Sequence, residues 1–192
     1  AATETRLAAL TERSSEEQLA LGGVQFLRAI EGTFQTRWAA GLTDRTGMLP
    51  LLRLPLEDNP NPPALDPNVI AKIFRDAEAQ LTIAQASLAA APSDGDYGLT
   101  LSLGDLWFDV NSNATRDPGE ALLDIAGPAL LGWQWTERDP ATPTPVIRFD
   151  AADAAWLSAY AHLLTGISQI VLAYDPTEPI SRSRLRTPAS RV

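Results

Sequence analysis

Six residues with oxygen in their side chains stand at regular spacing near the middle of the chain. They are Asp109, Asn111, Asn113, Thr115, Asp117 and Glu120. Their spacing corresponds to positions 1, 3, 5, 7, 9 and 12 of an EF-hand calcium loop. Ca²⁺ takes about six to eight oxygen ligands in flexible geometry, and a loop wrapped around it turns alternate residues inward. The sequence therefore predicts a Ca²⁺ site in the loop 109–120.

Each loop position has a predicted role in binding the ion. The residues at positions 1, 3 and 5 would supply side-chain oxygens, and Thr115 would supply its backbone carbonyl. Asp117 would bind directly or through a water molecule, and Glu120 would complete the shell with both carboxylate oxygens. With only three carboxylates among the ligands, we expect a Kd on the order of 10⁻⁴ to 10⁻³ M, the range of extracellular calcium modules.

One residue departs from the EF-hand pattern. Position 6 is normally glycine because the backbone turns there with positive φ, and this chain has Ala114. A residue with a side chain costs roughly 1 kcal/mol or slightly more in that conformation. We therefore expect Ala114 to weaken calcium binding.

A metal-free interpretation of part of the loop is a helix start. In Asp117-Pro118-Gly119-Glu120, Asp is a good N-cap, Pro suits the first helical position and Glu stands three residues after the cap. Asn111 and Asn113 would then be ordinary turn residues that bond to nearby backbone. This interpretation does not explain why Asp109 and both asparagines are in phase with Glu120. We therefore favour the cation site.

Three long amphipathic helices are predicted to position this loop. The first opens with the capping box Ser14–Glu17 and stops at Gly41, and glycine at positions 22 and 23 favours close approach of another helix. The second starts at Asp66-Pro67 and ends before Pro92. The third is capped by Asp150, with Asp153 near its start, and ends at Pro176. Its wide apolar face predicts a central position in the fold.

Shorter elements lie between the long helices. We expect a short helix over 3–12, a short strand or loose turn over 99–103, an exit helix over 118–126, and Pro-rich connections over 42–66 and 128–145. The predicted fold is mainly α: an irregular bundle of three long helices plus short helices, with packing like that of TPR repeats as the second choice. We predict one helical domain over 1–175 and a mobile basic tail over 176–192.

Charge and composition exclude several classes of protein. The 192-residue chain has a net charge of −9, and its last eleven residues contain four arginines and no acid. An acidic body argues against a nucleic-acid surface. The absence of cysteine excludes disulfides and thiolate metal sites. No run approaches the eighteen or so apolar residues of a transmembrane helix, so we expect at most peripheral membrane contact through the basic tail. The Ala-Ala-Thr start fits a periplasmic or otherwise exported chain after signal removal, or merely an arbitrary boundary of the sequence.

Three stretches together resemble a group of uncharacterised bacterial exported proteins. They are Phe26-Leu27-Arg28-Ala29-Ile30-Glu31-Gly32, Leu106-Trp107-Phe108-Asp109-Val110-Asn111, and the stretch from Phe149 to Leu164 that contains Asp-x-x-Trp-Leu-x-x-Tyr-x-His-Leu-Leu. The resemblance covers roughly residues 20–175. It implies export and cation binding at the loop, but no activity. Members of the group usually have glycine at the place of Ala114, and their chains continue beyond this tail.

An enzymatic alternative depends on His162, the only histidine. A hydrolase-type mechanism would use it as general base with an acidic partner, for which Glu31 is a candidate. A structural histidine bonded to a backbone carbonyl is the simpler interpretation. No nucleophile elbow, phosphate loop or dinucleotide motif is present, and Trp133 and Trp135 are interpreted as partly buried core rather than as a sugar site. We therefore predict a non-enzymatic module that binds a protein partner or a small ligand.

Overall fold

The computed structural model describes residues 2–42, 49–132, 135–139, 141–178 and 181. Within these residues it contains five helices and one small two-stranded sheet, and 55% of the described residues are helical. The prediction of a mainly α fold is confirmed. Parts of the connection 42–66 and most of the predicted tail 176–192 lie outside the described residues, as does Trp133.

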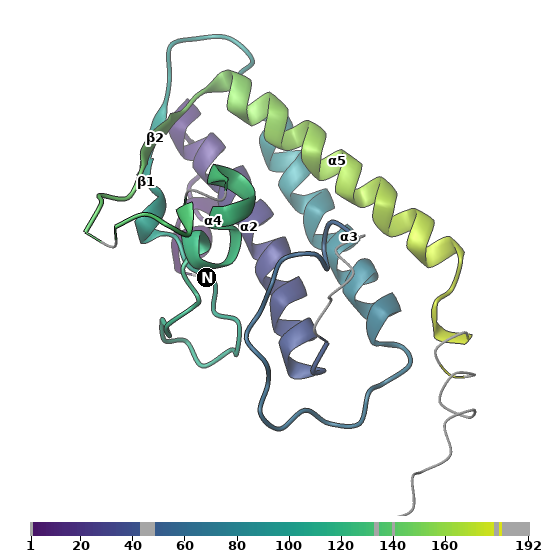
Figure 1. Cartoon of the computed structure of the whole chain (residues 1–192). Coiled ribbons are helices and arrows are strands. Elements are labelled where there is room, and N and C mark those ends of the chain that lie inside the picture. Colours follow the sequence, from purple (N-terminus) through teal and green to yellow (C-terminus); the bar gives the residue numbers. More distant parts are fainter. Residues whose placement is uncertain (1, 43–48, 133–134, 140, 179–180, 182–192) are drawn as a thin grey trace, which may run out of the picture.

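Three long helices lie side by side and form the body of the molecule (Figure 1). They are α2 (Ser15–Ala39), α3 (Val69–Ala89) and α5 (Ala151–Ala173). Helix α3 lies in the middle and packs along both of the others, whereas α2 and α5 make few contacts with each other. The prediction that the last helix is central is therefore wrong. The side chains of α3 that face both neighbours are the most completely buried, and Phe74, Leu81 and Ala84 have no exposed surface.

The starts of two long helices follow local capping chemistry. The Ser14 side chain accepts a hydrogen bond from the Glu17 N–H, and the Glu17 carboxylate accepts one from the Ser14 N–H. Asp150 and Asp153 form the same reciprocal pair before α5. Both predicted starts are confirmed because such caps need only residues close in sequence. Helix α3 instead begins two residues after Pro67, and its N-cap residue makes no side-chain capping bond.

Gly22 permits the close packing of α2 against α3. A Cβ atom at this position would lie 2.6 Å from the Leu88 side chain, closer than packed atoms approach. The neighbouring Gly23 has no atom within 4 Å of its Cβ position. The prediction of close helix approach is thus confirmed for the first glycine and wrong for the second.

The short elements lie mainly beside α2, and β2 also contacts α5. Helix α1 spans Ala2–Ala8, and β1 (Leu99–Ser102) pairs antiparallel with β2 (Val146–Phe149), with Leu99 opposite Phe149. A 3₁₀ turn (Leu103–Asp105) follows β1, so both expected conformations occur there. Helix α4 spans Leu122–Leu131 and contains Pro128, so the predicted exit helix over 118–126 has the wrong start and end.

A second hydrophobic cluster packs the loop 109–120 against α2. It brings Phe34 of α2 against Phe108 and Leu123, which flank the loop in sequence. The Phe34 and Phe108 rings meet edge to face with centroids 5.1 Å apart, a favourable aromatic geometry. The main cluster, by contrast, lies between α2, α3 and α5. The loop is therefore attached to the side of α2 rather than to the centre of the molecule.

Candidate metal site in the loop 109–120

The two ends of the loop are held together by a short antiparallel ladder. The Phe108 N–H donates to the Glu120 carbonyl at 2.9 Å, and the Leu122 N–H donates to the Leu106 carbonyl at 2.9 Å. Between these bonds, Trp107 and Ala121 form an isolated β-bridge. The loop is thus closed at its base by backbone contacts, so its first and last residues lie close together.

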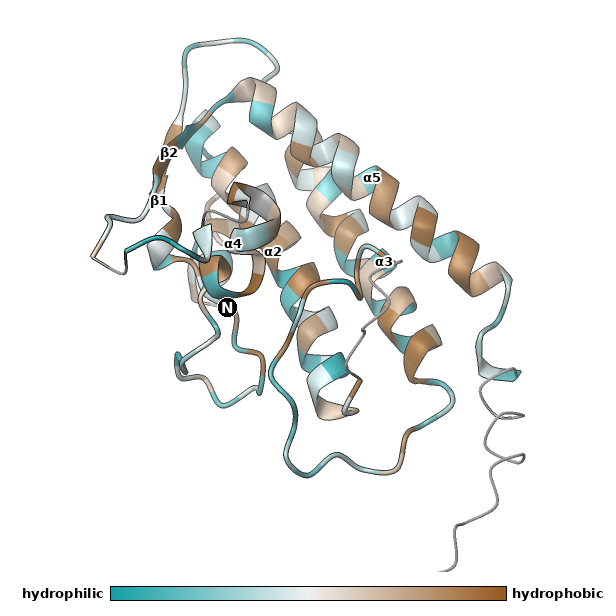
Figure 2. Ribbon diagram, in the orientation of Figure 1, coloured by the Kyte–Doolittle hydropathy of each residue, from teal (hydrophilic) through white to brown (hydrophobic). Residues whose placement is uncertain are grey.

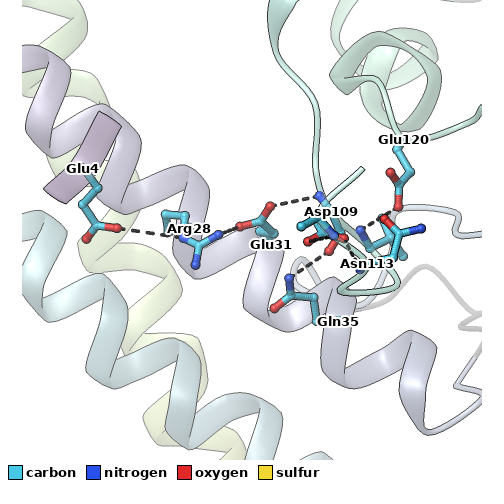
Figure 3. Close-up of polar contacts among 9 residues, drawn as sticks. Glu4, Arg28, Glu31, Gln35, Asp109, Asn113 and Glu120 are labelled. Atoms are coloured by element: carbon cyan, nitrogen blue, oxygen red, sulfur yellow. Dashed lines mark hydrogen bonds and ion pairs between the residues drawn. The ribbon is translucent and has the colours of Figure 1, made fainter. Parts of the chain in front are cut away.

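Two side chains of α2 fix the first loop residue. The Asp109 N–H donates to Glu31 Oε1 at 2.9 Å, and Gln35 Nε2 donates to the Asp109 carbonyl at 2.8 Å. Figure 3 shows that Glu31 also pairs with Arg28, which in turn approaches Glu4 of α1 at 3.9 Å. Glu31 is 8% exposed. The loop is therefore connected to α2 and α1 through one continuous chain of polar contacts.

The Asp109 carboxylate organises the middle of the loop. Its Oδ1 accepts from the Asn113 N–H at 2.9 Å, and its Oδ2 accepts from the Ala114 N–H at 3.0 Å. The chain reaches this arrangement through positive φ values of 61° at both Ser112 and Ala114. Ala114 thus has the left-handed conformation that position 6 of an EF-hand loop requires.

Both asparagines point toward the same carboxylate. The side-chain amides of Asn111 and Asn113 each donate to Asp117 Oδ2 at 2.7 Å. Their oxygens meanwhile accept backbone N–H groups, from Asn113 at 3.0 Å and from Thr115 at 2.7 Å. Positions 3, 5 and 9 of the loop therefore converge, with amide N–H groups next to the Asp117 carboxylate.

Glu120 is a buried carboxylate at the base of the loop, only 5% exposed. Its Oε1 accepts from the Val110 N–H at 2.8 Å, and its Oε2 accepts from the Asp117 N–H at 2.9 Å. A buried carboxylate needs such donors because removal from water is costly. Each oxygen has a second lone pair, so these bonds leave acceptor capacity on both.

The metal-free helix-start interpretation is wrong for Asp117. Helix α4 begins at Leu122, and its N-cap residue is Ala121, which makes no side-chain capping bond. The Asp117 carboxylate accepts the two asparagine amides rather than a helix N–H. Only the bond from the Asp117 N–H to Glu120 resembles a capping box. Hydrogen bonds within the loop thus replace the helix start that the local sequence predicts.

The residue types in the loop suit calcium, but their side chains are not arranged around a common point in this structure. All six predicted residues lie in one closed loop, and every side chain among them offers oxygen, the donor that Ca²⁺ prefers. However, the three carboxylates are not gathered: across the described part of the chain, no three His, Cys, Asp or Glu side chains form a group able to hold a metal. Ligation of a cation would need the asparagine amides to turn away from Asp117.

The residues of the enzymatic alternative are not brought together. His162 is exposed on α5, and within the described residues it makes no hydrogen bond or ion pair. Glu31 faces the loop instead, where its carboxylate bonds to Asp109 and Arg28. The predicted backbone bond of His162 is also absent from this part of the chain. Sequence reasoning missed the actual role of Glu31, for which the only signal was an acidic residue beside an apolar helix stripe.

An open pocket of about 330 Å³ lies beside α4. Its wall includes Trp135, whose ring is covered by the Arg138 guanidinium at 3.8 Å and whose Nε1 donates to the Leu123 carbonyl at 3.0 Å. These contacts occupy one face of the ring and its only polar atom. Trp135 is therefore a partly buried core residue, as predicted, rather than a free stacking surface for a sugar.

Comparisons with known proteins place this chain in no group. No protein-family model matches it, no curated protein matches it, and no solved structure matches it.

Proposed function

We propose that the loop 109–120 binds one Ca²⁺ and that the ion fixes the loop against α2. The six predicted ligands are Asp109, Asn111, Asn113, Thr115, Asp117 and Glu120. The observation that carries this proposal is the positive φ of 61° at Ala114, together with the two N–H groups that Asp109 accepts around it. EF-hand loops need a turn at this position, and here the chain makes it even without glycine.

Calcium binding would change the partners of only a few side chains. The Asn111 and Asn113 amides would release Asp117 and present oxygen toward the ion. Glu120 would contribute its remaining lone pairs while its backbone partners stay in place. Helix α2 would keep the loop backbone in place while these side chains move. The hydrogen bonds of the Asp109 backbone to Glu31 and Gln35 position the first proposed ligand from outside the loop.

The ligand set also favours a location outside the cytoplasm. Three carboxylates and two neutral amides give less charge than high-affinity sites have, so we propose a Kd of roughly 10⁻⁴ to 10⁻³ M. A site of this strength fills only where calcium is abundant, as it is for extracellular modules. We therefore propose an exported structural or binding module related to the uncharacterised bacterial exported proteins that it resembles.

The experiment is calorimetric titration of the full chain with Ca²⁺ and with Mg²⁺, alongside thermal unfolding in chelator and in excess calcium. A hundredfold excess over Kd stabilises a one-site protein by about 2.7 kcal/mol. We expect a corresponding rise in Tm with calcium and a smaller rise with magnesium, which prefers rigid octahedral sites.

Asp117→Asn and Asp105→Asn form a matched pair for this titration. Asp117 is a proposed ligand, whereas Asp105 is exposed in the 3₁₀ turn just before the loop. The first substitution should abolish the calcium-induced rise in Tm and the second should leave it intact. A wild-type Tm that does not respond to saturating calcium would refute the site.

A further inference from the structure

The outer face of α5 carries a row of large apolar side chains. Trp156, Leu163, Ile170 and Tyr174 are 66%, 56%, 60% and 83% exposed, respectively. Their spacings of seven, seven and four residues place them along one side of the helix. Figure 2 shows hydrophobic residues along the length of α5, and Figure 1 shows this helix at the edge of the helical body. An exposed apolar row of this kind indicates an interaction surface.

The opposite side of α5 is used by the fold. Ala161 and Ser168 have no exposed surface and Leu164 is 1% exposed, within the packing against α3. By length and composition α5 is the one helix among the described residues that could cross a membrane. This packing, however, leaves only its outer face available while the fold is intact.

The charge on and near α5 favours a second copy of the chain over lipid. From position 154 to 174 the sequence contains no Asp, Glu, Lys or Arg, so two copies of this acidic chain can meet here without bringing like charges together. Helices that lie on membranes usually carry Lys and Arg on their polar face, and α5 has neither. The described charged residues in α5 and just after it are all acidic: Asp153, Asp175 and Glu178.

Small residues alternate with the large ones along the exposed side. Ala159, Gly166 and Ala173 each follow a large residue by three positions, which gives a heptad pattern with large a and small d positions. One antiparallel register of two such helices places each large residue opposite a small one of the second copy. The facing pairs are Trp156 with Ala173, Leu163 with Gly166, and Ile170 with Ala159.

Two contacts within one chain agree with this register. No atom lies within 4 Å of the position that a Cβ at Gly166 would take, so the fold of one copy does not require glycine there. Leu163 of a second copy would fill this space. The Trp156 ring stacks on Tyr160 with centroids 5.4 Å apart, so its side chain is partly ordered before association, which lowers the entropy cost of binding.

We propose that two copies of the chain associate through antiparallel α5 helices, about a twofold axis that passes between Leu163 and Gly166. Such an interface is self-complementary, because each copy supplies the same large and small residues to the other. The association does not depend on calcium, since the loop 109–120 is attached to α2 and not to α5.

The exposed face is large enough for a dimer of moderate affinity. A fully buried Trp or Tyr contributes about 150–250 Å², so the exposed parts of Trp156 and Tyr174 amount to roughly 300 Å². Leu163, Ile170 and the smaller residues between them raise this to an area on the order of 700 Å² on each copy. Standard interfaces bury about 800 Å² on each partner. We therefore expect a Kd in the micromolar range.

The test is sedimentation equilibrium of the full chain in chelator, from about 1 to about 500 µM. We expect a reversible equilibrium between monomer and dimer. Leu163→Glu should weaken the dimer at least about a hundredfold, because it places two unpaired carboxylates beside the twofold axis. A wild-type chain that stays monomeric over the whole range would overturn the proposal.

Gly166→Met separates the packed register from general hydrophobic attraction. The new side chain meets open space within one copy, and methionine favours helix, so the fold should remain intact. It should nevertheless weaken the dimer at least about tenfold, because it takes the space that Leu163 of the second copy needs. Stronger association of Gly166→Met would contradict the proposed packing.

Disulfide trapping tests the orientation of the two helices, because the chain has no cysteine of its own. An oxidised mixture of Ala159→Cys and Ile170→Cys should give the mixed disulfide, since these positions face each other in the antiparallel register. Neither variant should cross-link with itself. Self-cross-linking of Ala159→Cys would indicate parallel helices and would overturn the antiparallel dimer.

Val146→Glu is the matched control, because Val146 is 65% exposed on β2, outside α5. It should dimerise like wild type, and circular dichroism should show every variant folded. Equal loss of the dimer in Val146→Glu and Leu163→Glu would refute an interface at α5. Flotation with phosphatidylcholine vesicles is the remaining measurement: binding by a chain that never dimerises, abolished by Leu163→Glu, would assign this face to lipid instead.

Discussion

Ala114 adopts a backbone conformation that residues with a Cβ atom rarely adopt. Its φ of 61° costs about 1 to 2 kcal/mol relative to the right-handed region. The loop retains it because the Ala114 N–H reaches the Asp109 carboxylate at 3.0 Å. The strain is therefore already present before any ion binds. We therefore expect the strain to lower the free energy of unfolding more than it lowers any affinity of the loop for calcium.

Ala114→Gly should consequently stabilise the protein in chelator by roughly 0.5 to 1 kcal/mol, the strain relieved minus the added backbone entropy of glycine. The Kd for calcium should change less than about threefold. Urea unfolding measures the first quantity and calorimetry the second. Ala155→Gly, at an exposed interior position of α5, is the control and should destabilise by about 1 kcal/mol. A large gain in affinity for Ala114→Gly with unchanged stability would contradict this account.

The residues proposed as ligands could be selected from the sequence because their spacing is a local pattern, whereas their hydrogen-bond partners in the structure could not be predicted. Glu31 and Asp109 are 78 positions apart, and no short-range pattern pairs them. Asp117 illustrates the converse error. It carries a strong local signal for a helix start, but two asparagine amides occupy its carboxylate and α4 begins five residues later.

At the scale of elements, helices with strong local caps were predictable and exposed short segments were not. Ser14 and Asp150 mark their helix starts to the residue. Strand β2 went unpredicted because Val146 and Ile147 are exposed and follow a Pro-rich segment, so no alternation of burial marks them. The position of α5 was predicted wrongly for a related reason: its apolar surface is wide, yet Trp156, Leu163 and Ile170 on it remain exposed.

Gly22 and Gly23 provide a matched test of how α2 packs on α3. Gly22→Ala should destabilise by about 1 to 3 kcal/mol, because its Cβ would overlap Leu88. Gly23→Ala should stabilise by about 0.5 to 1 kcal/mol, because its Cβ meets open space and alanine favours helix. Chemical denaturation of the two variants gives both signs. Equal effects would show that the two helices do not approach at Gly22.

Tyr97 ties the end of α3 to the sheet, and its hydroxyl donates to the Pro92 carbonyl at 2.6 Å. Burial, followed by the charge of Asp150, raises the pKa of Tyr97 above its ordinary value of 10.0. A raised pKa in the folded state contributes stability that is complete below pH 10.0 and is lost as pH rises through the folded-state pKa.

Tyr97→Phe should therefore cost about 1 kcal/mol near neutral pH, from the lost hydrogen bond. The difference from wild type should shrink above pH 10.0, where the wild type loses its contribution. Urea unfolding of both proteins at neutral and alkaline pH measures this difference. A gap between the two that stays constant with pH would contradict the assigned environment of Tyr97.

At the scale of the whole molecule, a polar chain runs from α1 through α2 to the loop. Glu4, Arg28 and Glu31 lead to the Asp109 N–H, and Glu31 is the only one of the three that is buried. This arrangement makes the position of the first proposed ligand depend on helices that are remote from it in sequence. The loop and the helical body should accordingly be coupled in stability.

Glu31→Ala should destabilise the protein by about 1 to 3 kcal/mol, because the Asp109 N–H loses its acceptor. It should also weaken calcium binding, since the first ligand is no longer positioned. Glu31→Gln keeps an acceptor oxygen and should cost less on both counts. Thermal unfolding in chelator and calorimetric titration separate the two effects. Identical calcium affinity in all three proteins would show that the chain of contacts does not position the loop.

The most direct test of calcium binding is a crystal structure of the full chain grown in excess calcium. The account predicts one density peak within the loop 109–120, with oxygens of Asp109, Asp117 and Glu120 among ligands at about 2.3 to 2.6 Å. The Asn111 and Asn113 amides should have left Asp117. A loop that still shows both amides bonded to Asp117 and no peak, with calcium plentiful, would contradict it.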